Sequence, residues 1–391
     1  MAKVPAENVI FDVMTNIILS VTNDLATDQR VHRVATTLTK NGAKVTLVGR
    51  LLKNSLPLNR GYKTYRMRLL FTKGPLFYAE YNVRLFLYLS FSKVDILVAN
   101  DLDTLLANYL VSVLRRKKLV YDAHELFTEV PELIGRNIVK NIWLKLENWL
   151  VPKVNYSYTV CKSISDIYTK KYGINMQVIR NVPLKMDKID RRFPYPGLPL
   201  SDFILYQGSV NIGRGIETLI DACEYLRDIK CVIVGDGDIM QAIQQRIIHK
   251  NLKDKVILLG KLPFEDLKRV TPFAALGVSI EEFQGFNYYY ALPNKLFDYI
   301  QSEIPVLVSD FPELRNVVNN YKIGEMLISR NPRELANQLE IMVKKSKDSF
   351  WKKNLAKTAE ELCWEKEEQV LMGIYGKLIS PKLDDQNMKK V

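Results

Sequence analysis

Short apolar runs alternate with amphipathic helical stretches along almost the whole chain. In the first half, the apolar runs cover residues 16–21, 44–48, 96–99, 119–121 and 156–160. The helical patterns between them cover residues 29–40, 102–115, 139–150 and 163–172. Runs of about five residues separated by helices of about a dozen are typical of a parallel, doubly wound sheet. This half of the chain is therefore expected to form an α/β domain.

The pattern breaks at residues 191–199, where three prolines fall within six residues and neither a helix nor a strand can continue. It then restarts with strand-like and helical segments at 203–207, 216–226, 231–234, 239–249, 256–258, 276–279, 294–300 and 306–308. Residues 350–379 are expected to be helical, with an apolar face that needs another surface to cover it. We expect an N-terminal domain at 1–190, a linker at 191–200, a C-terminal domain at 201–362, and a crossover helix and tail at 363–391.

Length and composition agree with two globular domains. The chain has 391 residues, 47% of them hydrophobic and 25% charged, which is too long for one ordinary core and too apolar for a disordered chain. The four cysteines are scattered without a C-x-x-C spacing, which argues against a disulfide framework or a zinc knuckle and fits a reducing compartment. The first residues do not read as a secretory signal, so we expect a cytoplasmic protein.

The positive charge is concentrated in the first half. Residues 1–190 hold 28 Lys and Arg against 16 Asp and Glu, whereas residues 191–391 hold 28 against 27. This asymmetry predicts an anionic partner for one domain, either nucleic acid or a membrane surface.

Loops that follow strands are the places to search for a site, because ligands of open parallel sheets bind beyond the carboxyl ends of the strands. Residues 206–215 (YQGSVNIGRG) form such a loop, and its small residues Gly208, Ser209 and Gly213 let a phosphate approach the backbone N–H groups. Arg214 adds a charge and a fork of donors. The alternative is a turn with a helix cap. The loop matches neither a Walker motif nor a dinucleotide turn, which disfavours kinases and dehydrogenases.

Two further segments of the second half carry candidate binding residues. Gly235 and Asp236 lie in a strand-to-helix turn that could border a nucleotide base or simply make a tight connection. Pro293 could begin a helix, which places Asn294 and Lys295 in its first turn and Asp298 one turn on. There the lysine could neutralise phosphate and the carboxylate could accept from ribose hydroxyls. The alternative is a solvated polar helix face.

In the first half, residues 120–125 end a strand with His124 between two acids. His124 is the candidate among the three histidines, since His32 and His249 fall within helical patterns. The Asp101-Leu-Asp103 triplet resembles a metal-binding D-x-D, but at a strand-to-helix junction either aspartate could cap the helix. We therefore expect no metal site.

Residues 60–93 are basic and then aromatic, and Glu80, Asn82 and Arg84 interrupt the apolar run, so it is not a transmembrane helix. A basic segment before an amphipathic aromatic helix suits an anionic leaflet, although part of the aromatic set must pack in its own domain. No nucleic-acid-binding motif accompanies the charge. The residues expected to face the membrane are Lys63, Arg66, Arg68 and Lys73.

Together these motifs resemble glycosyltransferase family 4, in its branch with a Pro-Asn-Lys motif, over nearly the whole chain. The likeness is carried by residues 28–31, 42–45, 121–126, 213–215, 234–237, 293–295, 304–306 and 364–365. It implies two Rossmann-like domains facing across a cleft (GT-B), with a C-terminal helix returning to the N-domain. It also implies metal-independent, retaining transfer of a sugar from a nucleotide-diphosphate donor to a lipid-linked or glycan acceptor, in bacterial surface polysaccharide or glycoconjugate assembly, without a cofactor.

The resemblance also implies roles for particular residues. Arg214 falls at the family's diphosphate lysine and Ser209 where its arginine would be, so Lys295 is expected to supply the missing cation. Asp298 matches the second of the family's paired glutamates and Tyr290 falls near the first, which Glu281 or Glu282 could replace. The donor set is Gly208, Ser209, Gly213, Arg214, Gly235, Asp236, Asn294, Lys295 and Asp298. The catalytic set is Arg214, Lys295 and His124, which would orient the donor sugar, and the acceptor side holds Asp28, Arg30 and Glu125.

We expect the enzyme to act in the cytoplasm, peripherally on the inner membrane, and not to bind nucleic acid. Two alternatives use the same fold. One is a sugar-nucleotide epimerase, which would turn over its donor without an acceptor. The other is a non-catalytic scaffold subunit of a transferase complex, favoured by the missing arginine and first glutamate.

Overall fold

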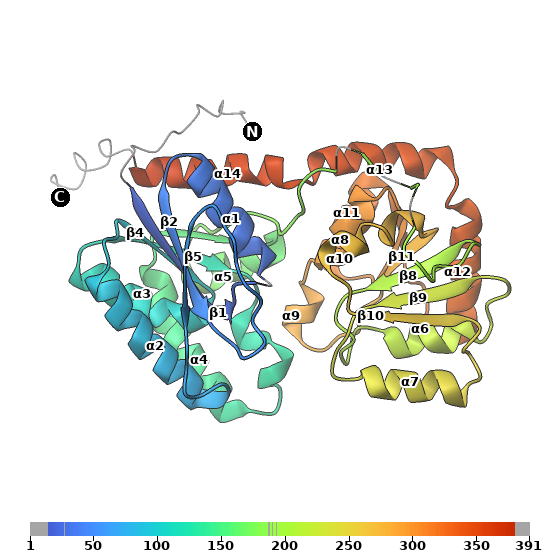
Figure 1. Ribbon diagram of the computed structural model, residues 1–391, viewed down its shortest axis with the longest axis horizontal. Coiled ribbons are helices and arrows are strands. Elements are labelled where there is room, and N and C mark those ends of the chain that lie inside the picture. Colours follow the sequence, from blue (N-terminus) through green and yellow to red (C-terminus); the bar gives the residue numbers. More distant parts are fainter. Residues whose placement is uncertain (1–14, 27, 187, 190, 193, 380–391) are drawn as a thin grey trace. The chain divides into compact units, whose positions relative to one another are not determined.

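The chain divides into two compact units in the computed structural model, which describes residues 15–26, 28–186, 188–189, 191–192 and 194–379 (Figure 1). The first unit comprises Met1–Arg180 and Glu365–Val391, and the second comprises Asn181–Trp364. Each unit is built on one parallel sheet with helices packed on it, as the alternating pattern predicts.

The sheet of the first unit has seven strands in the order β3-β2-β1-β4-β5-β6-β7, and all neighbouring pairs are parallel. Its strands are β1 (Asn16–Asp24), β2 (Lys44–Arg50), β3 (Lys63–Met67), β4 (Ile96–Asn100), β5 (Lys118–Ala123), β6 (Tyr156–Thr159) and β7 (Gln177–Val178). Its helices are α1 (Gln29–Lys40), α2 (Gly74–Phe91), α3 (Leu102–Leu114), α4 (Asn137–Leu150), α5 (Lys162–Tyr172) and α14 (Trp364–Ile379). The fully buried run of β4 shows why central strands read as continuous apolar segments.

The sheet of the second unit has six parallel strands in the order β10-β9-β8-β11-β12-β13. Its strands are β8 (Phe203–Gln207), β9 (Lys230–Val234), β10 (Val256–Gly260), β11 (Leu276–Ser279), β12 (Val306–Val308) and β13 (Gly324–Met326). Its helices are α6 (Ile216–Cys223), α7 (Met240–His249), α8 (Phe264–Leu267), α9 (Phe286–Tyr289), α10 (Asn294–Gln301), α11 (Pro312–Tyr321), α12 (Pro332–Lys345) and α13 (Ser349–Glu361). The order places β8 and β11 side by side at the centre, so the loops after these strands lie together.

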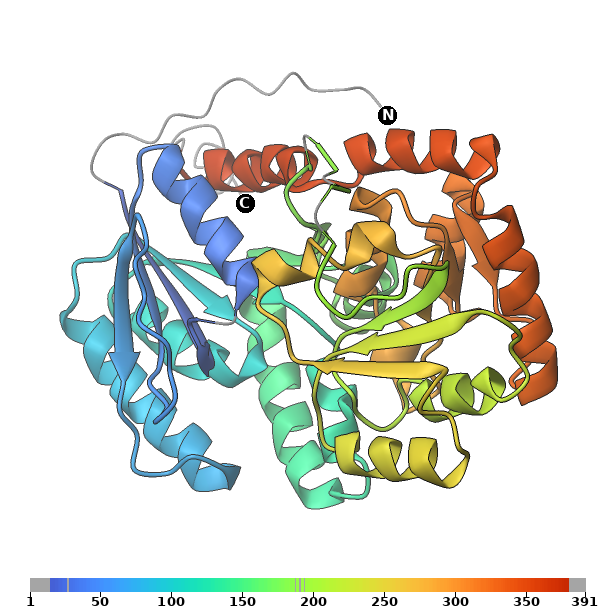
Figure 2. The same cartoon turned by 45° about the vertical axis from the view of Figure 1, so that its right-hand side comes forward.

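The C-terminal helical stretch over 350–379 consists of two helices, and the break between them lies next to residue 363, where the crossover helix is expected to begin (Figures 1 and 2). The helix α13 ends because Leu362 leaves the helical backbone, with ψ of 65°, and is fully buried. The backbone N–H of Trp364 then donates to the carbonyl of Pro183 instead of continuing the helix. Beyond this break α14 belongs to the first unit, as expected, where Glu367 forms an ion pair with Arg180 at 2.7 Å.

The proline-rich segment expected to be the linker belongs to the second unit. Arg191 donates to the carbonyl oxygens of Pro272 and Ser302, and the backbone of Tyr195 donates to Arg269. These bonds attach the segment to the second unit, so the chain divides at Arg180 rather than at 191–200. Among the described residues, no helix is both long and apolar enough to cross a bilayer.

Candidate active site

Two cations of the second unit converge on one carboxylate. Lys295 lies in the first turn of α10, and its Nζ is 2.9 Å from Oε1 of Glu281, in the loop after β11. Arg214, in the loop after β8, places Nη1 4.0 Å from the same oxygen. The Lys295 ammonium also lies 4.2 Å from the ring centre of Tyr206. Three segments distant in sequence therefore meet beyond the carboxyl ends of β8 and β11.

This cluster carries a surplus of positive charge. Burial acts to raise the pKa of Glu281, but Lys295 and then Arg214 outweigh it and hold the pKa below its ordinary value. The ionised Glu281 therefore balances one cation and leaves one charge unbalanced. The Nε of Arg214 is buried and has no hydrogen-bond partner within the described residues, while its guanidinium lies 4.4 Å over the ring of Tyr288. An anionic ligand would balance this charge.

Two glycines bring the turns after β8 and β9 into close contact beside this cluster. Gly208 has φ of 131° and Gly235 has φ of 151°, which L side chains rarely adopt. A Cβ atom on Gly235 would lie 1.8 Å from the carbonyl oxygen of Gly208. The turns after β8 and β9 therefore touch backbone to backbone, and only a residue without a side chain fits at position 235.

The other predicted donor residues lie around the same loops with other partners. Asp298 accepts a hydrogen bond from the side-chain amide of Gln207 at 3.0 Å. The exposed Asn294 accepts from Asn181 at 2.9 Å. Asp236 accepts from the N–H of the next residue in its own turn, and Ser209 is exposed beside Gly208.

The supports of the cluster are not evident from the sequence. Arg330, between β13 and α12, donates to the carbonyl of Ile280 at 3.2 Å and to Ser309 Oγ at 3.1 Å. It also donates to the carbonyl of Glu281 and so fixes the loop that presents this carboxylate. Glu282 lies 3.8 Å from Arg330 and does not pair with Lys295. The resemblance to the family's paired glutamates was the one signal that pointed to this loop, and it offered Glu281 and Glu282 equally.

In the first unit, His124 is held between two carboxylates. Its Nε2 lies 3.1 Å from Asp122 and its Nδ1 3.3 Å from Asp101, which also accepts from the His124 backbone N–H at 2.7 Å. Asp122 pairs in turn with Arg30 at 2.7 Å, and both are buried. Burial acts to lower the pKa of His124, but Asp101 and Asp122 outweigh it and raise the pKa to about 9. The ring is therefore an imidazolium at neutral pH, with both nitrogens already engaged.

The remaining acceptor-side residues sit at the same sheet edge. Asp28 caps α1 by accepting from the backbone N–H of Val31 at 3.1 Å, and Glu125 is half-buried directly after His124. Asp103 is buried, accepts from the hydroxyl of Thr22 at 2.5 Å, and has its pKa raised by burial to about 7. The hydrogen bond from Val31 gives Asp28 a structural role as the N-cap of helix α1.

The D-x-D triplet does not cap its helix through a side chain. Asp101 stands at the N-cap of α3 with φ of 63°, but its carboxylate turns to His124, which corrects the expectation for this residue. Within the ranges that the structure describes, no group of three His, Cys, Asp or Glu side chains could hold a metal ion.

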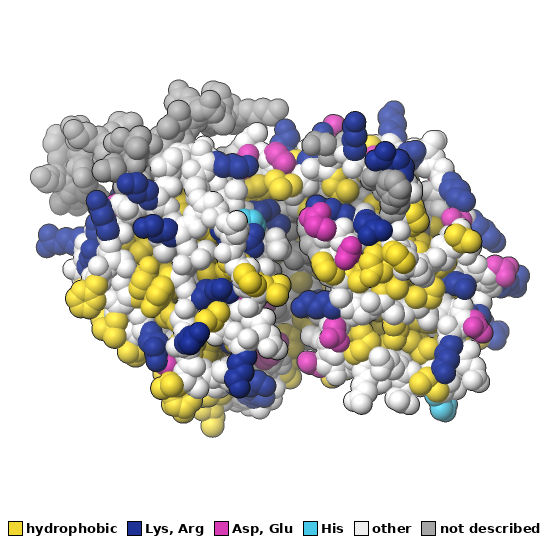
Figure 3. Space-filling view, viewed as in Figure 1, with side chains coloured by type: hydrophobic (Ala, Val, Ile, Leu, Met, Phe, Trp, Pro, Cys, Tyr) yellow, Lys and Arg dark blue, Asp and Glu magenta, His cyan; other side chains and the backbone are white. Residues whose placement is uncertain are grey.

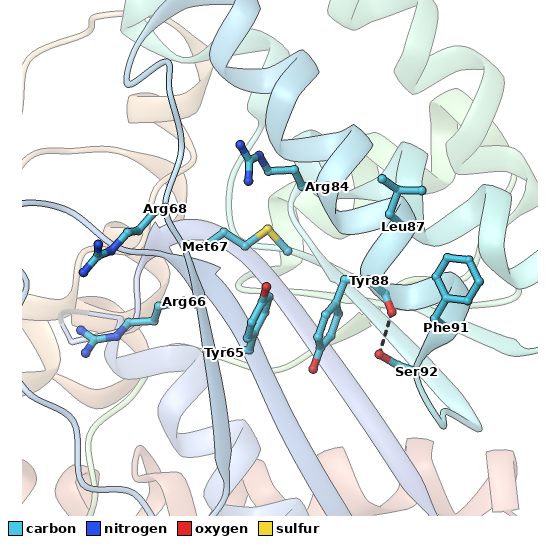
Figure 4. A pocket seen from close by; sticks show the side chains of 9 residues that line it. All are labelled: Tyr65, Arg66, Met67, Arg68, Arg84, Leu87, Tyr88, Phe91 and Ser92. Atoms are coloured by element: carbon cyan, nitrogen blue, oxygen red, sulfur yellow. Dashed lines mark hydrogen bonds between the residues drawn. The ribbon is translucent and has the colours of Figure 1, made fainter.

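The predicted membrane-facing residues lie on and after the edge strand β3. Arg66 donates to the carbonyl of Leu56 at 2.8 Å, and Lys73 stands at the N-cap of α2. Beside them, Tyr65 and Tyr88 stack at 4.4 Å and line a groove of about 700 Å³ between β3 and α2 (Figure 4). In Figure 4 the guanidinium groups of Arg66 and Arg68 point away from this stacked pair.

Comparison with known proteins identifies the class to which this architecture belongs. The chain resembles sucrose-phosphate synthase of Thermosynechococcus elongatus, with a TM-score of 0.73 and 18% identity over 93% of this chain and 99% of that one. It also resembles HepE of Anabaena in complex with UDP, with a TM-score of 0.64 and 14% identity over 93% and 100% of the two chains. These likenesses establish the GT-B fold.

Family models match both halves of the chain. Residues 28–183 match the model described as Glycosyltransferase Family 4, and residues 201–345 match the one described as Glycosyl transferases group 1. The O-antigen chain mannosyltransferase RfbU of Salmonella typhimurium is 27% identical over 177 residues, which is 44% of this chain and 46% of that relative. The matched region thus spans about half the length of this curated relative. The two matches, together with the GT-B fold, make the chain a glycosyltransferase of the family 4 type.

Proposed function

We propose that the protein is a retaining glycosyltransferase that moves a sugar from a nucleotide-diphosphate donor to a lipid-linked or glycan acceptor. The observation that carries the proposal is the surplus charge of Arg214 and Lys295 around Glu281, with an unpaired guanidinium N–H beside them. The UDP complex of HepE supports a nucleotide-diphosphate ligand. The name of the Salmonella relative supports bacterial surface polysaccharide assembly as the setting.

Both cations would act on the leaving diphosphate. In retaining transfer without an enzyme nucleophile, the bond from the sugar to the diphosphate oxygen breaks while the acceptor hydroxyl attacks from the same face. The departing oxygen then takes the proton of that hydroxyl. Charge develops on the diphosphate, so cations fixed beside it stabilise the transition state by several kcal/mol, on the order expected for such groups. Glu281 holds the two side chains in place without cancelling both charges.

His124 would contribute as a fixed cation rather than as a base. Its two ring nitrogens face carboxylates, so it has no free lone pair with which to take a proton from an acceptor hydroxyl. We assign it an orienting role toward the donor sugar through the small part of the ring that is exposed. The metal-independent route follows from the same idea, because protein cations supply the charge that a divalent ion supplies elsewhere.

The basic first unit would bind the acceptor side at an anionic membrane surface. The surplus of positive charge in residues 1–190 supports this, with Lys63, Arg66, Arg68 and Lys73 among its contributors. We accordingly propose a cytoplasmic enzyme bound peripherally to the inner membrane.

The test begins with the donor. A thermal-shift screen with UDP, GDP, ADP and CMP identifies the base, since a ligand at a hundred times its dissociation constant adds about 2.7 kcal/mol of stability.

The second experiment measures transfer with the matching donor and acceptor. Arg214→Ala and Lys295→Ala should each lower kcat about a hundredfold. Lys268→Ala serves as the control, because Lys268 is partly exposed and pairs locally with Glu265. Near-normal turnover in both cluster variants at saturating donor would refute the diphosphate assignment.

The same assay separates the alternatives. Donor turnover that needs no acceptor would indicate an epimerase, and nucleotide binding without turnover with any acceptor would indicate a scaffold subunit.

Removal of metal tests the cation assignment independently. Dialysis against EDTA should leave transfer unchanged, since Arg214 and Lys295 are proposed to neutralise the leaving group. Activity that is lost on dialysis and restored by magnesium or manganese would contradict this proposal.

A further inference from the structure

The loop between β3 and α2 holds two apolar side chains in solvent. Leu70 is 81% exposed and Phe71 is also exposed. The backbone N–H groups of both residues donate to the carboxylate of Glu80, at 2.9–3.0 Å for Leu70 and 2.9 Å for Phe71. Glu80 also pairs with Arg84 at 2.8 Å, and the two backbone hydrogen bonds lower its pKa. The backbone of this loop is thus fixed in place while its side chains face outward.

A second exposed apolar stripe lies on α4. Ile138 is 80% exposed and Ile142, one turn on, is also exposed. The two helices are joined by Tyr78 of α2 and Trp143 of α4, whose rings meet edge to face at 5.1 Å. The stripe and the loop therefore belong to one region of the unit.

Leu76, in the first turn of α2, is exposed as well. We call these five exposed apolar side chains the apolar rim, namely Leu70, Phe71, Leu76, Ile138 and Ile142. The loop that carries the first two follows β3, and α4 follows β5, so both leave the carboxyl edge of the sheet. Ligands of such sheets approach this edge.

Exposed cations flank the apolar rim. They are Arg68 and Lys73 beside the loop and Arg136 directly before α4, with Glu132 as an exposed acid in the same segment. In Figure 3, hydrophobic and basic side chains intermingle over the part of the first unit where Figure 1 shows α2. Exposed apolar side chains among Lys and Arg suit the interfacial layer of an anionic bilayer, where the apolar groups enter the acyl boundary and the cations meet headgroups.

We propose that the apolar rim inserts into the interfacial region of an anionic leaflet and so brings the carboxyl edge of the first unit to the membrane surface. This deepens the proposed function, on which it rests for the lipid-linked acceptor. The charge surplus of residues 1–190 selects an anionic bilayer over an uncharged surface. Glu80 contributes by fixing the backbone of the loop before the protein reaches the membrane, so that binding costs little conformational entropy.

The test is co-sedimentation of the full chain with vesicles of equal parts phosphatidylglycerol and phosphatidylcholine. The double variants Leu70→Ser/Phe71→Ser and Ile138→Ser/Ile142→Ser should each weaken binding by about tenfold or more. The matched control is Leu87→Ser/Phe91→Ser at the far end of α2, where both side chains are also exposed. Equal binding of wild type and both rim variants, or an equal loss in the control, would overturn the proposal.

A second measurement does not depend on losing a function. Phe71→Trp should shift its emission to the blue on addition of these vesicles, and an unshifted spectrum would count against insertion. Nucleotide-induced thermal shifts, and transfer to a water-soluble acceptor, should stay at wild-type levels in all these variants. Failure of transfer with intact vesicle binding would refute the proposed function alone, and the reverse would refute the apolar rim alone.

Discussion

At the scale of the residue, the environment of His124 shows how a side chain acquires a charge that its type does not dictate. Both ring nitrogens face carboxylate oxygens, of Asp101 and Asp122, and a carboxylate only accepts. The ring therefore carries both protons. Arg30 binds the far side of Asp122 and keeps this second carboxylate ionised. Burial raises the pKa of Asp101 to about 8, so Asp101 and His124 titrate as a pair beside the buried ion pair of Arg30 and Asp122.

This arrangement predicts the titration of His124. Carbon-13 histidine NMR should show one imidazole with a pKa of about 9, and Asp101→Asn should move that pKa toward the ordinary value of about 6.5. Since the folded pKa of His124 is raised, the stability that its own proton contributes is fully present below about pH 6.5 and is lost as the pH rises through about 9. His32 serves as an internal control, because burial and then Arg60 lower its pKa to about 4. An imidazole of His124 that titrates near 6.5 in the wild type would contradict the double carboxylate contact.

Residue types and their elements were predictable here, but partners were not. Arg214 and Lys295 were expected at two helix starts on one sheet edge, and they lie there. Their common partner Glu281 was only one of two candidates, because a loop of uncertain length does not say which acid turns inward. Arg330 gave no signal, since its hydrogen bonds go to backbone carbonyls whose position depends on the fold.

At the scale of the element, buried strands and their following helices were predictable because apolar runs and helical periodicity are local properties. The edge strand β3 was missed, because four of its five residues are charged or exposed and it pairs only with β2. The crossover helix was expected to start at residue 363, but the cause of the break between α13 and α14 could not be read from the sequence. Leu362 and Trp364 continue the apolar helical spacing, and the bond to Pro183 that redirects the chain is a long-range contact.

The turns after β8 and β9 give a prediction about an element junction. Gly235→Ala should destabilise the second unit by roughly 2 kcal/mol or more, because its Cβ would overlap the Gly208 carbonyl at a backbone conformation already unfavourable for alanine. The nucleotide-induced thermal shift should be lost as well, since the Gly208 loop must move. Urea unfolding and thermal shift with nucleotide measure the two effects.

The control for this prediction is Gly173→Ala. Gly173 also has a positive φ, at 68°, but a Cβ there meets nothing within 4 Å. This variant should cost only about 1 kcal/mol, the ordinary penalty for alanine in the left-handed region, and should keep its response to nucleotide. Equal behaviour of the two variants would mean that the close approach of the two turns does not matter.

At the scale of the whole molecule, the two units share an architecture and differ in charge. Both carry a parallel sheet with candidate residues beyond the carboxyl ends of its strands, as repeated α/β patterning predicted. The excess of Lys and Arg lies almost entirely in the first half of the chain. One unit is thus suited to an anionic surface and the other to a small ligand bound by a few fixed cations.

This division predicts that membrane binding and donor binding separate by mutation. Each lysine or arginine near an anionic surface contributes about 1 kcal/mol at most, and the attraction fades within a Debye length of roughly 8 Å at physiological salt. Binding to anionic vesicles should therefore weaken as salt is raised. It should also weaken in a variant with four cations of the first unit replaced by glutamine, namely Lys63, Arg66, Arg68 and Lys73.

The charge-matched control replaces four exposed lysines of the second unit by glutamine, namely Lys344, Lys347, Lys352 and Lys353. Both variants lose the same net charge, so an effect of location shows as a difference between them. Sedimentation with vesicles should release the first variant and retain the second, while nucleotide affinity stays unchanged in both. Equal release of the two variants would show that total charge, rather than the basic segment around β3, draws the protein to the membrane.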